Sequence, residues 1–179
     1  MTDREPGGAT YDQATDHRGS DHQAADHHAI ARALLANAHA PYSRFPVAAV
    51  VVTRAGGEFH GVNVENAAYG STICAERMAI GAMVTAGDRS GIARVVVAGH
   101  GDDPLTPCGA CRQVIAEFSR PDTIVTSRSD DGQEAAWTVA DLLPAAFGPL
   151  RLAAGADVTG ADPGRDREPE PTTDPVSDS

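Results

Sequence analysis

The three cysteines of the chain limit its fold more than any other feature of the sequence. Cys74 precedes a run of apolar residues at helical spacing, and Cys108 and Cys111 begin a second predicted helix. Cysteines three residues apart share one helical face. A fold that brings the starts of both helices together would therefore place all three thiols around one point.

Such a group of thiols suits a zinc ion. The free amide groups and the positive dipole end of a helix N-terminus favour the thiolate form that a metal requires. Three thiolates with a fourth position left open are typical of a catalytic zinc site, whereas a structural site normally has a fourth protein ligand. The alternative is that the cysteines are small buried apolar residues, which would need no such spacing.

Glu76 favours the catalytic interpretation. It stands two residues after Cys74, in the first predicted turn, where its carboxylate can reach past the helix end toward a water on the metal. The alternative is an acidic residue that interacts with the helix dipole, which contributes well under about 1 kcal/mol. Together the two segments match a zinc-deaminase signature in which Cys replaces His, namely Cys74-Ala75-Glu76 and Pro107-Cys108-Gly109-Ala110-Cys111.

The segments around the cysteines predict an α/β fold. Strands are expected where β-rich runs stand between turn residues, at 47–52, 58–64, 92–98, 124–127 and 135–138. Helices are expected at 27–38 with Asp26 as N-cap, at 74–86, at 108–118 and briefly after Thr138. The order α-β-β-α-β-α-β-β-α indicates a mixed sheet covered by helices.

The net charge of −11 lies mostly at the two ends of the chain. Residues 1–26 and 153–179 are acidic and polar, and we expect both to be disordered because they cannot bury enough apolar surface to offset chain entropy. Residues 27–152, which we expect to form one domain, contain twelve acidic residues and ten Arg. Because this balance lacks the basic excess of phosphate-binding proteins, no long nucleic acid is expected as a partner.

The sequence also predicts a cytoplasmic protein that does not bind membranes. No run approaches the roughly 20 apolar residues of a membrane span, and the polar start lacks the features of a signal peptide. Three cysteines, an odd number, suit a reduced compartment better than a disulfide scaffold.

Over about residues 28–152 the chain resembles the short, three-cysteine cytidine deaminases. Three motifs besides the cysteine segments carry the resemblance, namely Pro41-Tyr42-Ser43-Arg44-Phe45-Pro46-Val47, Asn63-Val64-Glu65-Asn66-Ala67-Ala68-Tyr69-Gly70 and Leu142-Leu143-Pro144-Ala145-Ala146-Phe147-Gly148. The resemblance implies a three-layer α/β/α fold with a mixed sheet and a zinc cofactor. It implies hydrolytic conversion of cytidine or deoxycytidine to uridine or deoxyuridine, with release of ammonia. It also implies a homotetramer whose active sites are shared between subunits.

The resemblance assigns roles to individual residues. Glu76 would move protons as general base and then as general acid. Asn63 and Glu65 match the positions that hold the ribose hydroxyls, although a turn Asn and a solvated Glu are the alternative. Phe45 matches an aromatic residue of the site. Phe147 matches the residue that reaches a neighbouring subunit's pyrimidine, although a place in the core fits it nearly as well.

Two further positions are compared with the family pattern. Arg77 matches a residue that bonds the cysteine sulfurs, and a guanidinium there would draw off the excess negative charge of three thiolates on one Zn²⁺; an exposed surface Arg is the alternative. Ala48 stands where the family commonly has Gly, beside the substrate-side strand. Its methyl group could tighten the pocket or be absorbed by the structure.

Three other functions compete with this interpretation. A blasticidin-type aminonucleoside deaminase would share the zinc site but would depart from the pattern at Glu65, so the intact Asn63-Val64-Glu65-Asn66 favours cytidine. A nucleic-acid editing deaminase would need a positively charged channel that the balanced domain does not supply. A zinc-stabilised binding module without catalysis would not depend on Glu76.

Overall fold

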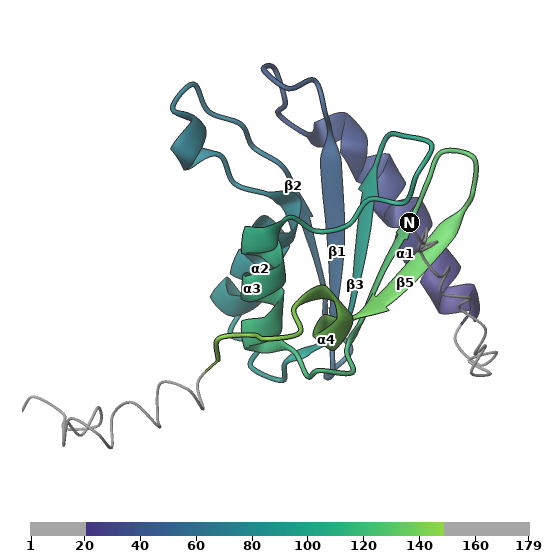
Figure 1. The fold of residues 1–179 in the computed structure, drawn as a ribbon, viewed down its shortest axis with the longest axis vertical. Coiled ribbons are helices and arrows are strands. Elements are labelled where there is room, and N and C mark those ends of the chain that lie inside the picture. The colour runs from purple at the N-terminus through teal and green to yellow at the C-terminus, as the bar shows by residue number, and fades with distance from the viewer. Residues whose placement is uncertain (1–20, 149–179) are drawn as a thin grey trace, which may run out of the picture.

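A mixed sheet of five strands forms the middle layer of the computed structural model, which describes residues 21–148 (Figure 1). Its strand order is β2-β1-β3-β4-β5. The strands are β1 (Val47–Thr53), β2 (Glu58–Val62), β3 (Ile92–Gly99), β4 (Ile124–Arg128) and β5 (Glu134–Thr138). β1 pairs antiparallel with β2 and β3, whereas β4 pairs parallel with β3 and antiparallel with β5. The predicted mixed sheet is confirmed.

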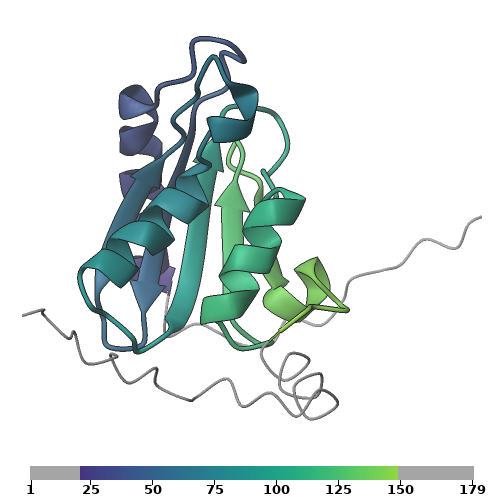
Figure 2. The ribbon, with the colours of Figure 1, turned by 90° about the vertical axis from the view of Figure 1, so that its left-hand side faces the viewer.

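Helices cover both faces of this sheet. One face carries α2 (Ala75–Thr85) and α3 (Gly109–Phe118), which lie side by side in Figure 2, and the other carries α1 (Asp21–Leu34). α1 continues into the 3-10 turn η1 (Leu35–Asn37), η2 (Tyr69–Ser71) is a second such turn, and the short α4 (Val139–Leu142) follows β5. The expected three-layer α/β/α arrangement is therefore present.

Strand β1 is buried on both faces. Successive side chains of a strand point to opposite sides, so its residues contribute to two core layers. Ala49 and Val51 belong to the core beneath α2 and α3. Ala48 and Val50 belong to the core beneath α1, where they pack with Ala31 and other residues. These two apolar layers hold the helices against the sheet.

The starts of α2 and α3 meet at one edge of the sheet. Val47 at the start of β1 pairs with Gly99 at the end of β3, and Ala48 pairs with Val62 at the end of β2. The chain therefore leaves β2 and β3 at the same edge before it enters α2 and α3. In open α/β sheets, ligands bind beyond the carboxyl ends of the strands. The carboxyl ends of β2 and β3 lie at this end of the sheet, so a ligand site is expected here.

The observed boundaries differ from the predicted ones mainly near the N-terminus. Helix α1 begins at Asp21 rather than near residue 27, so Asp26 lies within the helix and not at its N-cap. The sequence predicts disordered tails at residues 1–26 and 153–179. Residues 21–26 belong instead to α1, whereas residues 1–20 and 153–179 lie outside the described residues. Within residues 21–148, no helix is long and apolar enough to cross a membrane.

Candidate active site

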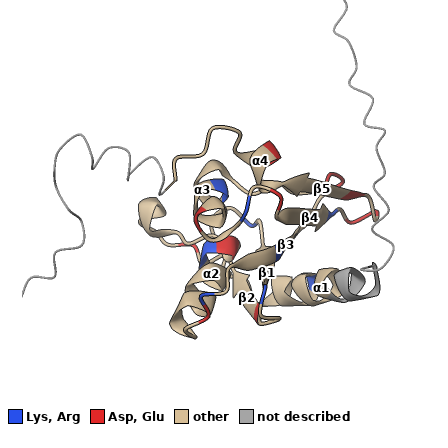
Figure 3. Cartoon of the chain, turned by 90° about the horizontal axis from the view of Figure 1, so that it is seen from below, with Lys and Arg blue, Asp and Glu red and all other residues tan. Residues whose placement is uncertain are grey.

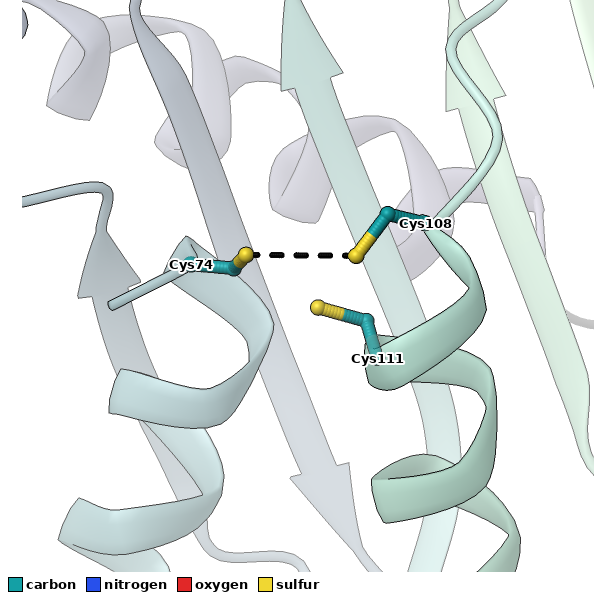
Figure 4. A group of neighbouring side chains, drawn as sticks. All are labelled: Cys74, Cys108 and Cys111. Atoms are coloured by element: carbon teal, nitrogen blue, oxygen red, sulfur yellow. Dashed lines mark hydrogen bonds between the residues drawn. The ribbon is translucent and has the colours of Figure 1, made fainter. Parts of the chain in front are cut away.

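The three thiols converge between the starts of α2 and α3 (Figure 4). Cys74 and Cys108 are the N-cap residues of these helices, and Cys111 lies in the first turn of α3. The three sulfur atoms all lie within 4.8 Å of one another. The sequence spacing predicts this cluster because each thiol stands at a helix start.

The geometry of the thiols fits a zinc ion. Two sulfurs that each lie about 2.3 Å from one tetrahedral ion are about 3.8 Å apart. The distance between the Sγ atoms of Cys74 and Cys108 is 3.9 Å. Cations that prefer oxygen ligands, such as Mg²⁺ and Ca²⁺, are not suited to a set of three sulfurs.

The ionisation of all three thiols together depends on a bound cation. Burial raises the pKa of Cys74 and of Cys111. Burial acts in the same direction on Cys108, but hydrogen bonds from the amide and thiol of Cys111 bring the pKa of Cys108 below its ordinary value. Three thiolates at this spacing repel one another, so a divalent cation among them is needed to hold all three in the charged form.

Glu76 lies beside the thiols, in the first turn of α2. Its side chain is only 3% exposed, which is unusual for a carboxylate. Its negative charge contributes to the raised pKa values of Cys111 and Cys74. The side chains of a helix lean toward its N-terminus, and this brings the carboxylate toward the thiols.

A cavity of about 220 Å³ opens at this point, and it contains most of the predicted site residues. Phe45, Asn63 and Glu76 line it together with Cys74 and Cys108. Its remaining lining residues, which sequence reasoning did not single out, are Val47, Thr72, Ala75, Leu105 and Thr106. Leu105 and Thr106 directly precede the Pro107-Cys108 motif, so their position in the sequence could have indicated them.

Leu105 is held in the wall of the cavity by contacts on β3 and β4. Its amide donates to the Ser127 hydroxyl at 3.0 Å. A Cβ atom on Gly99 would lie 2.9 Å from its side chain and 3.6 Å from that of Phe45. The absence of a side chain at Gly99 therefore makes room for Leu105.

Asn63 is buried and joins the end of β2 to the start of β1. Its side-chain oxygen accepts from the Val47 amide at 2.8 Å, and its side-chain nitrogen donates to the Phe45 carbonyl at 2.9 Å. An amide nitrogen carries two hydrogens, so a second donor remains for a ligand in the cavity. The side chain thus shapes the cavity wall as well as lining it.

Glu65 lies in a neighbouring hollow rather than in the cavity itself. Tyr42, Ser43, Tyr69 and Thr72 line this hollow with it, and Thr72 also lines the cavity. The two spaces are therefore adjacent.

The Arg77 guanidinium contacts one of the thiols. Its Nη2 atom donates to the Cys74 sulfur at 3.7 Å and to the Thr72 carbonyl at 2.8 Å. The hydrogen bond to Cys74 raises the pKa of Arg77. The positive charge of Arg77 therefore lies against the thiol cluster, where it can offset the negative charge of thiolates.

The other two singled-out positions lie away from the cavity. Phe147 is 59% exposed, and its backbone carbonyl accepts from the Gln113 side chain at 2.7 Å. Phe147 does not line the cavity of its own chain. Ala48 is fully buried beneath α1, on the opposite face of the sheet from the thiols, so its methyl group is absorbed by the core and does not narrow the cavity.

Comparisons with known proteins agree with this architecture. The family model described as the cytidine and deoxycytidylate deaminase zinc-binding region matches residues 22–127. A cytidine deaminase of Sporosarcina psychrophila is 46% identical over 120 residues, which are 67% of this chain and 88% of that protein. The crystal structure of a cytidine deaminase from Burkholderia pseudomallei superposes with a TM-score of 0.66 at 44% identity, over 69% of this chain and 98% of that one. A crystal structure from Mycobacterium leprae gives a TM-score of 0.58 at 37% identity, over 67% and 96% of the two chains.

Proposed function

The chain belongs to the cytidine and deoxycytidylate deaminase family, and from this premise we infer that it hydrolyses cytidine and deoxycytidine to uridine and deoxyuridine plus ammonia. One observation carries the assignment to this site. Three thiols that fit a zinc ion share a cavity with a buried carboxylate, Glu76, and with Asn63. Zinc, when bound by Cys74, Cys108 and Cys111, acts as a Lewis acid that makes water a nucleophile near neutral pH.

Glu76 is the proton carrier of the proposed reaction. Its carboxylate takes a proton from the attacking water and delivers it to the ring nitrogen next to the amine-bearing carbon. It then delivers the second proton of the water to the departing amine, which leaves as ammonia. The oxygen of the water remains on the ring as the carbonyl of the product, so the atoms balance.

Arg77 and the cavity walls support this chemistry. The guanidinium against Cys74 offsets part of the negative charge of three thiolates. Phe45 and Leu105 provide apolar walls for a flat base. The enclosed position of Glu76 excludes bulk water from the carboxylate that moves the protons.

The adjacent hollow is suited to the sugar. A nucleoside whose base lies in the cavity would extend past Thr72, which lines both spaces, toward Glu65. Both backbone contacts of Glu65 use the same oxygen, Oε2. Its other oxygen can then accept a hydrogen bond from a ribose hydroxyl, and Asn63 can donate one. Blasticidin-type deaminases depart from the nucleoside pattern at the position of Glu65. The presence of Glu65 beside this hollow therefore favours a nucleoside as the substrate.

A free nucleoside also fits the charge distribution better than a nucleic acid does. Arg and acidic residues are interspersed over the described elements in the view of Figure 3, and no long basic stripe crosses them there. Binding of a nucleic-acid strand requires a positively charged groove along its backbone.

We further propose a homotetramer in which Phe147 contacts the substrate of a neighbouring subunit. The exposure of its ring and its absence from the cavity of its own chain support this role. Sedimentation analysis in solution tests the assembly. A cytoplasmic location, testable by cell fractionation, is supported by the need of the site for three reduced thiols.

Substitution of Glu76 by Gln tests the proposed reaction, because the amide keeps the shape of the side chain but cannot carry the proton. We expect zinc content and melting temperature close to those of the parent protein and a turnover of cytidine lower by about 100-fold to 10,000-fold. Absorbance of the pyrimidine ring measures turnover, and metal analysis measures zinc. As a control, Glu117→Gln changes an exposed carboxylate on α3 and should leave both quantities unchanged.

Two results would contradict the proposal. Turnover by the Glu76 variant at near the parent rate would remove Glu76 from the reaction. Parent protein that binds zinc but does not deaminate cytidine would indicate a zinc-stabilised binding module instead of an enzyme.

A further inference from the structure

The segment that carries Phe45 is held by the Glu65 side chain. Between η1 and β1 the chain passes through Tyr42 and Ser43, whose amides both donate to Glu65 Oε2, at 2.8 and 3.2 Å. A carboxylate that accepts two backbone donors is fixed in orientation more firmly than one in free solvent. The Glu65 carboxylate is therefore already aligned before a sugar arrives.

Ser43 makes a contact on each side of this arrangement. Its hydroxyl accepts from the Phe45 amide at 3.0 Å, and its own amide donates to Glu65 Oε2 at 3.2 Å. Hydrogen bonding from Ser43, together with the Tyr42 amide, holds the pKa of Glu65 below its ordinary value. One residue therefore links the residue of the cavity wall to the predicted sugar ligand.

The backbone of the turn that contains Ser43 is strained at the next residue, Arg44. Arg44 has a φ of 56°, in the left-handed region that residues other than glycine rarely adopt. Ser hydroxyls stabilise such turns by bonding the amide two residues further on, which is the contact made to Phe45. The Ser43 side chain therefore keeps the strained turn in the conformation that places Phe45 at the cavity.

We propose that Ser43 is a positioning residue for sugar recognition: its hydroxyl holds the turn through the Phe45 amide, and the Tyr42 and Ser43 amides of that turn orient the Glu65 carboxylate toward a ribose hydroxyl. This inference rests on the proposed role of Glu65 as a sugar ligand. Ser43 itself needs no contact with the substrate. Its effect should therefore depend on whether the substrate has sugar hydroxyls for Glu65 to bind.

Kinetics with cytidine and with 2′,3′-dideoxycytidine test the proposal. For Ser43→Ala we expect the KM for cytidine to rise by about threefold to tenfold, as for loss of one neutral hydrogen bond, with kcat changed by less than about twofold. With the dideoxy substrate the same variant should lose less than about twofold in kcat/KM. Ser43→Thr, which keeps the hydroxyl, should recover most of the KM for cytidine.

Controls separate this effect from a general loosening of the turn. Arg44→Ala alters the same exposed turn without removing the Ser43 hydroxyl, and its KM ratio between the two substrates should match that of the parent. Zinc content and melting temperature should stay unchanged in all of these variants.

The outcomes distinguish the inference from the function on which it rests. Equal losses of Ser43→Ala on both substrates would mean that the hydroxyl affects Phe45 but not the orientation of Glu65, and would overturn the proposal. A Thr variant as impaired as the Ala variant would also count against the hydroxyl contact. If Glu65→Gln affects both substrates equally, the sugar-binding role of Glu65 itself is wrong, whatever Ser43→Ala shows.

Discussion

The guanidinium of Arg77 lies within hydrogen-bond distance of one thiol, so its contribution to the proposed metal centre can be measured separately from that of the proposed ligands. The contact to Cys74 offsets negative charge, and the contact to the Thr72 carbonyl holds the side chain in place. Partners of this kind around a metal typically affect affinity or activity by about 10-fold to 100-fold.

Arg77→Gln should therefore lower the kcat for cytidine by about 10-fold to 100-fold, because uncompensated thiolates make the zinc a weaker Lewis acid. Steady-state kinetics and metal analysis measure the two quantities. Arg89→Gln, which changes an exposed Arg beyond the end of α2, is the matched control. A parent-like kcat in the Arg77 variant would show that the contact has no electrostatic role.

Single residues also show how far sequence reasoning reached. The thiol cluster was predictable because helix starts and three-residue spacing are local properties of the chain. The contacts of Asn63 with Phe45 and Val47 were not, because they join segments 16 to 18 residues apart through backbone groups whose directions only the folded loop determines. For the same reason the sequence did not indicate that Glu65 accepts from Tyr42 and Ser43.

At the scale of elements, the position of α2 depends on its close approach to β2. A Cβ atom on Gly61 would lie 2.2 Å from the Ala75 carbonyl oxygen and 2.5 Å from the Ala79 amide nitrogen. Both contacts involve backbone atoms, so the helix and the strand would have to separate. Because Glu76 and Cys74 lie in this first turn, the spacing between the two elements sets their place in the site.

Gly61→Ala should destabilise the protein by about 1 to 3 kcal/mol, as for other overpacked positions, and should weaken zinc binding as the turn with Cys74 shifts. Denaturant unfolding and a zinc titration measure the two effects. Gly81→Ala is the control on the same helix, because a Cβ atom there would meet nothing within 4 Å. That substitution should be neutral or stabilise by up to about 1 kcal/mol. Equal stability of the two variants would mean that β2 and α2 can separate freely.

The elements themselves were largely predictable from apolar periodicity and turn residues. The exceptions have local causes. Helix α1 continues back to Asp21 through residues that the sequence assigned to a polar tail, because Asp, His and Gln tolerate a helix even where they do not favour one. β2 ends at Val62, and Val64 makes only isolated bridges with His39 and Ile73 as the chain turns toward the site.

For the molecule as a whole, a buried histidine on α1, His28, links stability to pH. Burial lowers the pKa of His28 below its ordinary value of 6.5, although the nearby Glu134 acts in the opposite direction. Arg128 and Arg94 on the sheet and His27 on the same helix lower it further. The folded protein therefore keeps His28 neutral at pH values where the unfolded chain already binds a proton.

The free energy of unfolding should then be largest above about pH 6.5 and should fall as the pH drops below it toward the lower folded pKa, by at most about 1.4 kcal/mol per pH unit for one proton. Urea unfolding between pH 5 and pH 8 measures this slope. His28→Gln should flatten it, whereas His100→Gln, at an exposed histidine, should not. An unchanged slope in the His28 variant would assign the effect to other groups.

Helix α2 follows directly after Cys74, and this thiol makes no capping hydrogen bond to its own helix. Ser, Asp or Asn at such a position typically stabilises a helix by about 1 kcal/mol. The chain gives up that stabilisation at the point where it presents sulfur. The proposed zinc site and the stability of α2 therefore place opposite demands on a single side chain.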